Sequence, residues 1–168
     1  MIRALGALAR AAAVLTRLSI ALAAALMLAA IAYQVLMRYV FGDTPAWSEE
    51  LAVLLFGWTV LGGLALGVHE GYHVRLTVLP DALPGRARVW AERATDAVTA
   101  ALGGFLLWSG LRFYDITAGS VSAAIGYPIE ILNALAPICG ALMALFGVER
   151  ALRPAAALPP PQAETHAA

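Results

Sequence analysis

The chain has 168 residues, of which 61% are hydrophobic and only 13% are charged, a composition that excludes an ordinary soluble domain. Eleven arginines balance eleven acidic residues, and the resulting net charge of zero offers no electrostatic footprint for a nucleic-acid partner. Cys139 is the single cysteine, which excludes an internal disulfide and any cysteine-based zinc cluster. We therefore expect an all-α integral membrane protein embedded in the lipid bilayer.

Three arginines precede the first long apolar run. Arg3, Arg10 and Arg17 recur every seven residues, so on a helix they share one face. Such a basic face predicts an amphipathic N-terminal segment, 1–17, at the lipid surface. The apolar run that follows is longer than the core of a usual signal peptide, and we expect it to be retained as a membrane anchor.

Four long windows without a charged residue follow one another along the chain. A helix needs about 20 residues to cross a hydrocarbon core about 30 Å thick. The third window is the shortest, but Arg93 and Arg112 can snorkel to the two interfaces, where Trp90 and Trp108 would join the aromatic belts. The windows predict a four-helix membrane domain, 18–153, with spans at about 18–37, 51–68, 94–112 and 130–148.

The arginines also predict an orientation. Nine of the eleven lie before the first span, between the second and third, or after the fourth, whereas Arg38 and Arg112 lie on the opposite side. Because cytoplasmic loops retain Arg and Lys, both termini are predicted to be cytoplasmic.

The second cytoplasmic connection has a pattern of its own. Residues 73–79 alternate polar and apolar side chains, Pro80 and Pro84 interrupt the chain, and 85–93 then has a helical pattern. These features predict an interfacial arm helix between the second and third spans. The proline-rich tail, 154–168, has little apolar bulk and is predicted to be disordered.

The segment 38–51, RYVFGDTPAWSEEL, joins the first two spans and carries the densest set of candidate site residues. Helical steps of four, three and four place four apolar side chains on one face, with Glu50 beside them: Trp47, Leu51, Leu54 and Trp58. We predict that this face meets a partner protein. The alternative is that Trp47 is an interfacial belt residue and that Glu49 and Glu50 are solvated residues favoured by the helix dipole.

Arg38 ends the first apolar span, and two functions are open to it. A lone arginine at this position usually snorkels to the interface. Alternatively, its guanidinium reaches Glu49 or Glu50 across the short turn and forms a charge-assisted pair that sets how the first two helices meet.

Small residues are placed to let helices approach closely. They are Gly63 and Gly67 in the second span, and Ala136, Gly140 and Ala144 in the fourth. In the fourth span, Pro137 removes a backbone donor and is predicted to kink the helix.

The sequence HEGYH, 69–73, formally matches the zinc-protease pattern H-E-x-x-H. In a membrane metallohydrolase, His69 and His73 would bind zinc and Glu70 would be the general base. However, Gly71 favours the end of a helix there, and no third protein ligand stands in a recognisable motif. We therefore predict neither a metal nor a cofactor.

The middle of each predicted span lacks Asp, Glu, His, Lys and Arg. Ionisable groups at that depth mark proton relays and ion pathways, so their absence argues against a stand-alone small multidrug or proton-coupled transporter. It also predicts that the chain carries no catalytic site of its own.

Between 33 and 153 the sequence resembles the small, DctQ-like membrane subunit of tripartite ATP-independent periplasmic (TRAP) transporters. Three segments carry the resemblance: MRYVFGDTPAWSEELAVLLFGWTVLGG, GYHVRLTVLPDALP and AIGYPIEILNALAPICGALMAL. The second lies where such subunits have a G-x-H-V-x-V pattern, which supplies an explanation for His73 that needs no zinc.

The resemblance implies a non-enzymatic subunit in a bacterial inner membrane. Such subunits form a complex with a large permease subunit that holds the sodium and substrate sites, and a periplasmic solute-binding protein delivers the ligand, often a carboxylate-bearing metabolite. The small subunit is thought to be a scaffold for secondary transport, against which the transport domain of the large subunit moves.

Overall fold

The structure, a computed structural model, describes residues 2–71 and 86–152. Its main elements are α1 (Ile2–Leu36), a π-helical turn η1 (Met37–Phe41), α2 (Ala46–Glu70), α4 (Arg86–Ile116), α5 (Glu130–Asn133) and α6 (Leu135–Ala151). Four helical segments within these residues are long and apolar enough to cross a membrane, which confirms the all-α membrane fold class. Residues 86–93 of the predicted arm form the start of α4, whereas the rest of the arm, His73 and the tail 154–168 lie outside the described residues.

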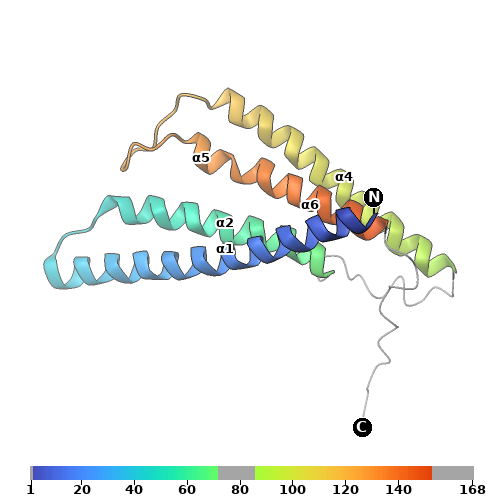
Figure 1. The fold of residues 1–168 in the computed structure, drawn as a ribbon. Helices are drawn as coiled ribbons and strands as arrows, with labels where there is room; N and C mark the ends of the chain where they lie inside the picture. The colour runs from blue at the N-terminus through green and yellow to red at the C-terminus, as the bar shows by residue number, and fades with distance from the viewer. Residues whose placement is uncertain (1, 72–85, 153–168) are drawn as a thin grey trace, which may run out of the picture.

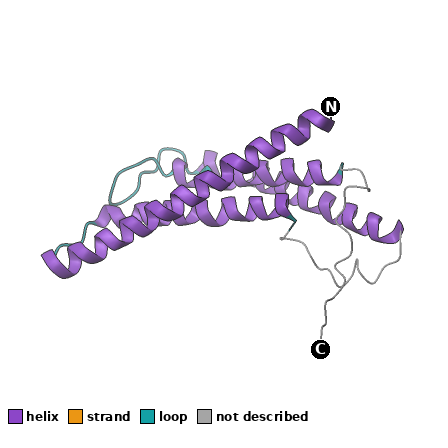
Figure 2. Ribbon diagram, turned by 60° about the horizontal axis from the view of Figure 1, so that its bottom comes forward, coloured by secondary structure: helices purple, strands orange, loops and turns teal. Residues whose placement is uncertain are grey.

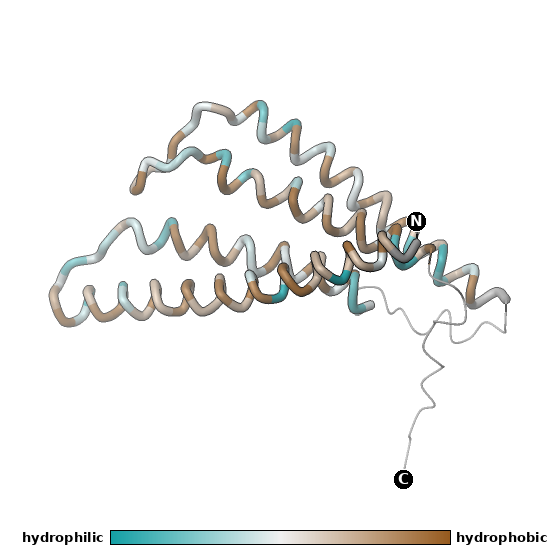
Figure 3. The backbone as a smooth tube through the Cα atoms, viewed as in Figure 1, coloured by the Kyte–Doolittle hydropathy of each residue, from teal (hydrophilic) through white to brown (hydrophobic). Residues whose placement is uncertain are grey.

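The helices form two antiparallel pairs (Figure 1). In one pair α1 packs against α2, in the other α4 packs against α6, and α2 and α6 join the pairs. The turn η1 and the loop 117–129 lie at the same end of the bundle, which we call the corner end (Figure 1 and Figure 2). The opposite end, where α1 begins and α2 ends, is called the terminal end. Strongly hydrophilic positions lie mostly toward these two ends (Figure 3).

Helix α1 is continuous across the predicted boundary between residues 17 and 18. It runs from Ile2 through Leu36 without a break, so the predicted division between 1–17 and a span beginning at residue 18 is not a helix end. At 1.5 Å per residue its 35 residues extend about 52 Å, well beyond the roughly 30 Å of hydrocarbon. Small side chains spaced three or four apart bury one face of the early part: Gly6, Ala9, Ala13 and Thr16. This segment is therefore part of the bundle.

The other helices also extend beyond their predicted spans. Helix α2 begins at Ala46, five residues before the predicted start at residue 51, and α4 continues to Ile116. The physical reason is that the backbone stays hydrogen-bonded within a helix after its side chains become polar. The uncharged windows therefore located the spans but not the helix ends.

Helices α4 and α6 are in backbone contact because glycines face each other across their interface. A Cβ atom on Gly103 would lie 2.5 Å from the Ala144 nitrogen, and one on Gly110 would lie 2.7 Å from the Pro137 Cδ. Gly140 would similarly meet the backbone of Leu107. The predicted close contact through Gly140 and Ala144 is thus confirmed.

In the second predicted ridge, Gly63 is not the glycine that packs on α1. A Cβ on Gly63 would meet nothing within 4 Å, whereas one on Gly62 would lie 3.1 Å from Ile20 of α1. Gly63 therefore makes no close contact with the described residues of this chain, and its suitability for contact with a further helix stays a prediction. Gly63 faces outward because the side of α2 that packs on α1 includes Gly62 and Ala65, both of which are buried.

The helical hydrogen bonding of the fourth span is interrupted at Ala134, between α5 and α6, although Ala134 keeps a helical conformation (φ −65°, ψ −19°). Pro137 lies three residues further on, and its ring disfavours a helical carbonyl at Asn133. A hydrogen bond from the Ile138 nitrogen to the Ala134 oxygen (3.1 Å) links α6 to the residue that follows α5.

The buried apolar core lies toward the terminal end. It combines alanines of α1 with residues of α2 and α6: Ala9, Ala13, Ala65, Val68, Cys139, Met143 and Phe146. The Cys139 Sγ donates to the Leu61 oxygen at 3.0 Å and so ties α6 to α2. The rest of the bundle leaves many large apolar side chains exposed, as expected for helices surrounded by lipid or by partner helices.

Candidate functional site

At the corner end the chain reverses direction through η1 and a glycine. Gly42 adopts a left-handed conformation (φ 71°), which a residue with a Cβ rarely adopts, and it ends the π-helical turn. Pro45 then precedes the first residue of α2, and the Ser48 hydroxyl donates to the Pro45 oxygen at 2.6 Å. This turn sets the start of α2 and places Glu49 and Glu50 in its first turn and a half.

Glu50 is the centre of a hydrogen-bonded site that joins distant parts of the chain. Its Oε2 accepts from the Ser122 hydroxyl at 2.7 Å and from the Ile125 nitrogen at 3.0 Å. Its Oε1 accepts from the Ala124 nitrogen at 2.7 Å. All three donors belong to the loop between α4 and α5, so one carboxylate of α2 binds a loop more than 70 residues later in the chain.

The loop that Glu50 binds is folded on itself. The Ser122 nitrogen donates to the Tyr127 oxygen at 2.9 Å, and the Ser122 Oγ accepts from the Gly126 nitrogen at 3.0 Å. Val121 and Pro128 form an isolated antiparallel bridge. Ser122 is buried and takes part both in the loop and in its contact with α2.

The far side of the loop is tied to the helices on either side of it. The Gly119 nitrogen donates to the Glu130 carboxylate, and the Asn133 side chain donates to the Thr117 hydroxyl at 2.6 Å. These contacts join the end of α4 to the start of α5.

The ion pair predicted for Arg38 is not formed in this structure. Glu49 instead accepts a hydrogen bond from the Gln34 side chain at 2.9 Å, and the Glu50 oxygens are occupied by the loop. Arg38 lies exposed in η1. Of the two alternatives open for Arg38, the ion pair is therefore not found, because the donors to Glu50 come from a loop far away in the sequence.

The tryptophan face of α2 is directed partly toward α1. The Trp58 Nε1 donates to the Ser19 hydroxyl at 3.1 Å, and the Trp47 ring lies 5.7 Å from that of Tyr33. Leu54 on the same face is half-buried. This face therefore contacts α1, although Trp47 keeps part of its surface exposed.

A different side of α2 is exposed. Val53, Phe56 and Val60 follow one another at intervals of three and four and are exposed, and Gly63 continues the same row. This face was not predicted from the sequence, because the prediction of a partner contact was based on the tryptophans and glutamates of another face of α2. The three-and-four spacing of these residues was the signal that could have identified it.

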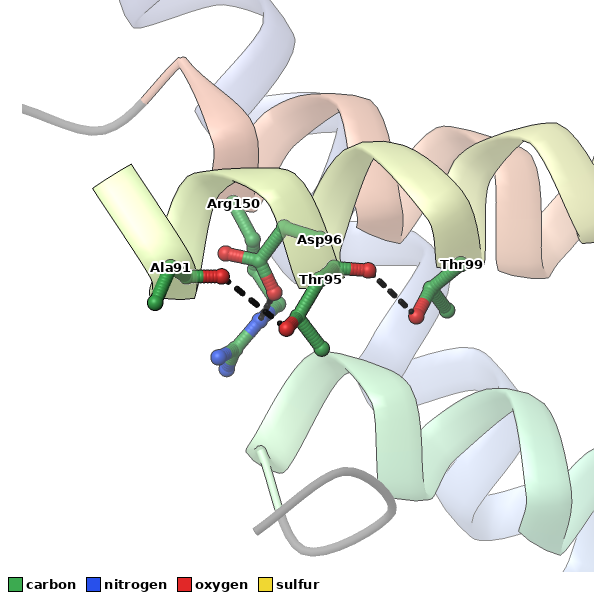
Figure 4. Close-up of polar contacts among 5 residues, drawn as sticks. All are labelled: Ala91, Thr95, Asp96, Thr99 and Arg150. Carbon is green, nitrogen blue, oxygen red and sulfur yellow. Dashed lines mark hydrogen bonds and ion pairs between the residues drawn. The ribbon is translucent and has the colours of Figure 1, made fainter. Parts of the chain in front are cut away.

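At the terminal end, ion pairs join helices within each pair. The Arg150 Nε of α6 lies 2.9 Å from the Asp96 Oδ1 of α4, next to the intrahelical bonds of Thr95 and Thr99 (Figure 4). In the other pair, Arg17 of α1 binds Glu70 of α2. Neither contact was predicted, because each joins residues more than 50 positions apart.

Gly71 ends α2 with a left-handed conformation (φ 80°), as the sequence suggested for this position in HEGYH. A Cβ at this position would lie 2.6 Å from the Arg150 Nη1, so glycine also leaves room for the guanidinium. The His69 ring lies 4.8 Å from that of Phe146, a buried residue of the core. Within the described residues, no group of three or more His, Cys, Asp or Glu side chains is placed to hold a metal, and His73 lies outside them.

The geometry defines a class of protein. The four membrane-length helices make the chain a multi-pass membrane protein. Its hydroxyl, carboxylate and guanidinium groups described above hold these helices together. Residues 27–157 match the family described as tripartite ATP-independent periplasmic transporters, DctQ component. This match covers most of the chain, and the chain belongs to that family.

Individual relatives are consistent with this family assignment. The chain is 29% identical over 126 residues to the sialic acid TRAP transporter small permease protein SiaQ of Vibrio cholerae, covering 75% of this chain and 73% of that protein. It is 41% identical over 54 residues to the C4-dicarboxylate TRAP transporter small permease protein DctQ of the same organism, covering 32% and 23%. It is 26% identical over 110 residues to the sialic acid TRAP transporter permease protein SiaT of Haemophilus influenzae, covering 66% and 18%.

The predicted resemblance is therefore confirmed. The chain is a small permease subunit of the TRAP transporter class and not an enzyme, because members of this family are transporter subunits. The metallohydrolase and the stand-alone multidrug transporter considered from the sequence are not favoured.

Proposed function

We propose that this chain is a scaffold that holds a large TRAP permease subunit in the bilayer, without forming a solute pathway itself. The observation that carries the proposal is the distribution of its polar groups. The central parts of its spans lack Asp, Glu, His, Lys and Arg. Near the ends, Glu50, the Arg17–Glu70 pair and the Asp96–Arg150 pair bind other helices or the loop of this same chain. Its exposed apolar surface is suited to packing against further helices.

A large partner is supported by one of the relatives. The region of SiaT from Haemophilus influenzae that matches this chain is only 18% of that permease protein, so a similar segment is there joined to a much longer polypeptide. Segments that are covalently joined in one protein commonly act together. We infer that this chain associates non-covalently with a large permease subunit that corresponds to the remaining part of SiaT.

We assign the contact with the large subunit to the exposed side of α2. Val53, Phe56 and Val60 make this side apolar, and Gly63 has no neighbour within 4 Å. A glycine on an apolar face permits the backbone of another helix to approach. The tryptophan face is less suited, since Trp58 already bonds Ser19.

The test is recovery of the large subunit with a tagged small subunit from native membranes. Gly63→Leu should reduce the co-purified large subunit about tenfold, the effect of losing about 1.4 kcal/mol of association energy. Gly104→Leu is the matched control, because Gly104 also has nothing within 4 Å but lies on α4. Equal recovery with both variants would reject the α2 face. A wild-type chain recovered alone, or only with copies of itself, would reject the scaffold.

The remaining parts of the proposal concern the transported solute and the orientation. SiaQ and DctQ are named for sialic acid and C4-dicarboxylates, both of which carry carboxylates, and these names support a carboxylate-bearing solute delivered by a periplasmic binding protein. The arginine distribution supports an inner-membrane location with both termini in the cytoplasm. A fluorescent protein fused to the C-terminus should fold and fluoresce, whereas periplasmic phosphatase activity from an equivalent fusion would contradict this orientation.

A further inference from the structure

The two helix pairs are joined differently at the two ends of the bundle. Toward the terminal end, α2 and α6 share a buried core, to which Cys139, Met143 and Phe146 contribute. In the view of Figure 1 the pairs spread apart toward the corner end, where less of the chain is buried. A contact that joins the pairs there has correspondingly more influence on their relative position.

Toward the corner end, the side-chain hydrogen bonds that join the pairs within the described residues all end on Glu50. The carboxylate accepts from the Ser122 hydroxyl and from the backbone nitrogens of Ala124 and Ile125. A carboxylate that accepts several hydrogen bonds forms charge-assisted contacts, which are stronger than those between neutral groups. Its partners are mainly backbone donors, so the contact depends on the loop having its folded shape.

The loop is held in that shape from within. Ser122 accepts from the Gly126 nitrogen while it donates to Glu50, and its own nitrogen donates to Tyr127. Loosening the contact with Glu50 therefore releases two loop amides and removes the acceptor of the Ser122 hydroxyl. These groups would then bind water, because Ala124 and Ile125 are exposed residues.

We propose that Glu50 is a positioning residue that locks loop 117–129 onto α2 and makes the two helix pairs one rigid body at the corner end. The consequence for transport rests on the proposed scaffold function, since a fixed support is needed only if another subunit moves against it. The lock itself is a property of this chain. It goes beyond the family assignment, which gives no function to Glu50.

Glu49 provides a matched comparison. It has the same charge and lies next to Glu50, but its carboxylate accepts from Gln34, so that its contact lies within the α1–α2 pair. Removing Glu49 alters the charge of the corner without removing an acceptor from the loop. A difference between variants at the two positions therefore isolates the contact with the loop from general electrostatic effects.

The experiment uses the full chain in lipid nanodiscs and two measurements. Hydrogen exchange reports the protection of the Ala124 and Ile125 amides. Spin labels at Leu36 and Phe113, exposed residues near the corner ends of α1 and α4, report the distance between the pairs by double electron–electron resonance. The labelling background is Cys139→Ser, whose hydroxyl can still donate to Leu61.

In the wild-type chain we expect both amides to be protected and the distance distribution to be narrow. Glu50→Gln replaces one of the two acceptor oxygens by an NH2 group that can only donate, and it removes the negative charge from the other oxygen. Exchange at the two amides should therefore accelerate about tenfold or more, and the distance distribution should broaden. Glu49→Ala should leave both measurements at their wild-type values.

Several results would overturn the proposal. They are unprotected amides in the wild type, wild-type behaviour of Glu50→Gln, and equal changes in Glu49→Ala. If Glu50→Gln does not fold, Ser122→Ala removes one donor to Glu50 without altering α2, and unchanged amide exchange in that variant would also reject the lock. These measurements need no partner, so failure to recover a large subunit would reject the scaffold and leave the lock standing.

Discussion

The α4–α6 pair and the α1–α2 pair are both antiparallel, yet they are held together in different ways. In the α4–α6 pair, glycines bring the backbones into contact, and the Asp96–Arg150 ion pair is largely buried. In the α1–α2 pair, Gly62 faces the Ile20 side chain instead of backbone atoms, Trp58 bonds Ser19, and the Arg17–Glu70 ion pair is more exposed. Close backbone packing therefore creates a low-dielectric site in which a polar contact contributes more to stability.

The largest expected effect is on the glycine interface. Gly103→Leu would push a side chain into the backbone of α6, because even a Cβ would lie 2.5 Å from the Ala144 nitrogen. We expect a loss of about 3 kcal/mol or failure to fold. Unfolding can be followed with a thiol-reactive dye, since Cys139 is the single cysteine and is buried.

The neighbouring residue supplies the control for this prediction. Gly104→Leu places the same side chain one position along α4, where a Cβ meets nothing within 4 Å. Its thermal midpoint should stay near that of the wild type. Equal midpoints for the two variants would mean that backbone contact does not hold the α4–α6 pair.

The next effect is on the buried ion pair. Asp96→Ala leaves the Arg150 guanidinium without its carboxylate, and the two side chains are only 11% and 25% exposed. We expect a loss of about 1–3 kcal/mol in the free energy of unfolding. The double variant with Arg150→Ala should lose less than the sum of the two single variants, and an additive result would show that the pair is not coupled.

The smallest effect is on the exposed ion pair. In the Arg17–Glu70 pair the side chains are 60% and 29% exposed, so water and salt screen the interaction. Arg17→Ala should cost about 0.2–1 kcal/mol, and the loss should shrink as salt is added. A loss larger than that of Asp96→Ala would reverse the comparison between the two helix pairs.

The sequence was sufficient to predict the class of fold and the family. Uncharged windows located four spans, because a helix in lipid satisfies its own backbone hydrogen bonds and needs only enough apolar residues to cross. The corner motif with Trp47 and Glu50 led to the family, which the match over residues 27–157 confirms. These are properties of local segments, and they can be read without knowing what lies beside them.

Which groups contact one another follows from the packing of the helices and cannot be predicted from the sequence. Glu50 binds the amides of Ala124 and Ile125, and Gly62 packs on Ile20 of α1 whereas Gly63 faces outward. The Asp96–Arg150 pair was likewise not visible in the sequence. The physical reason is that helix rotation and loop position depend on packing between segments far apart in the chain. A sequence pattern defines the faces of a helix, but its neighbours determine which face is used.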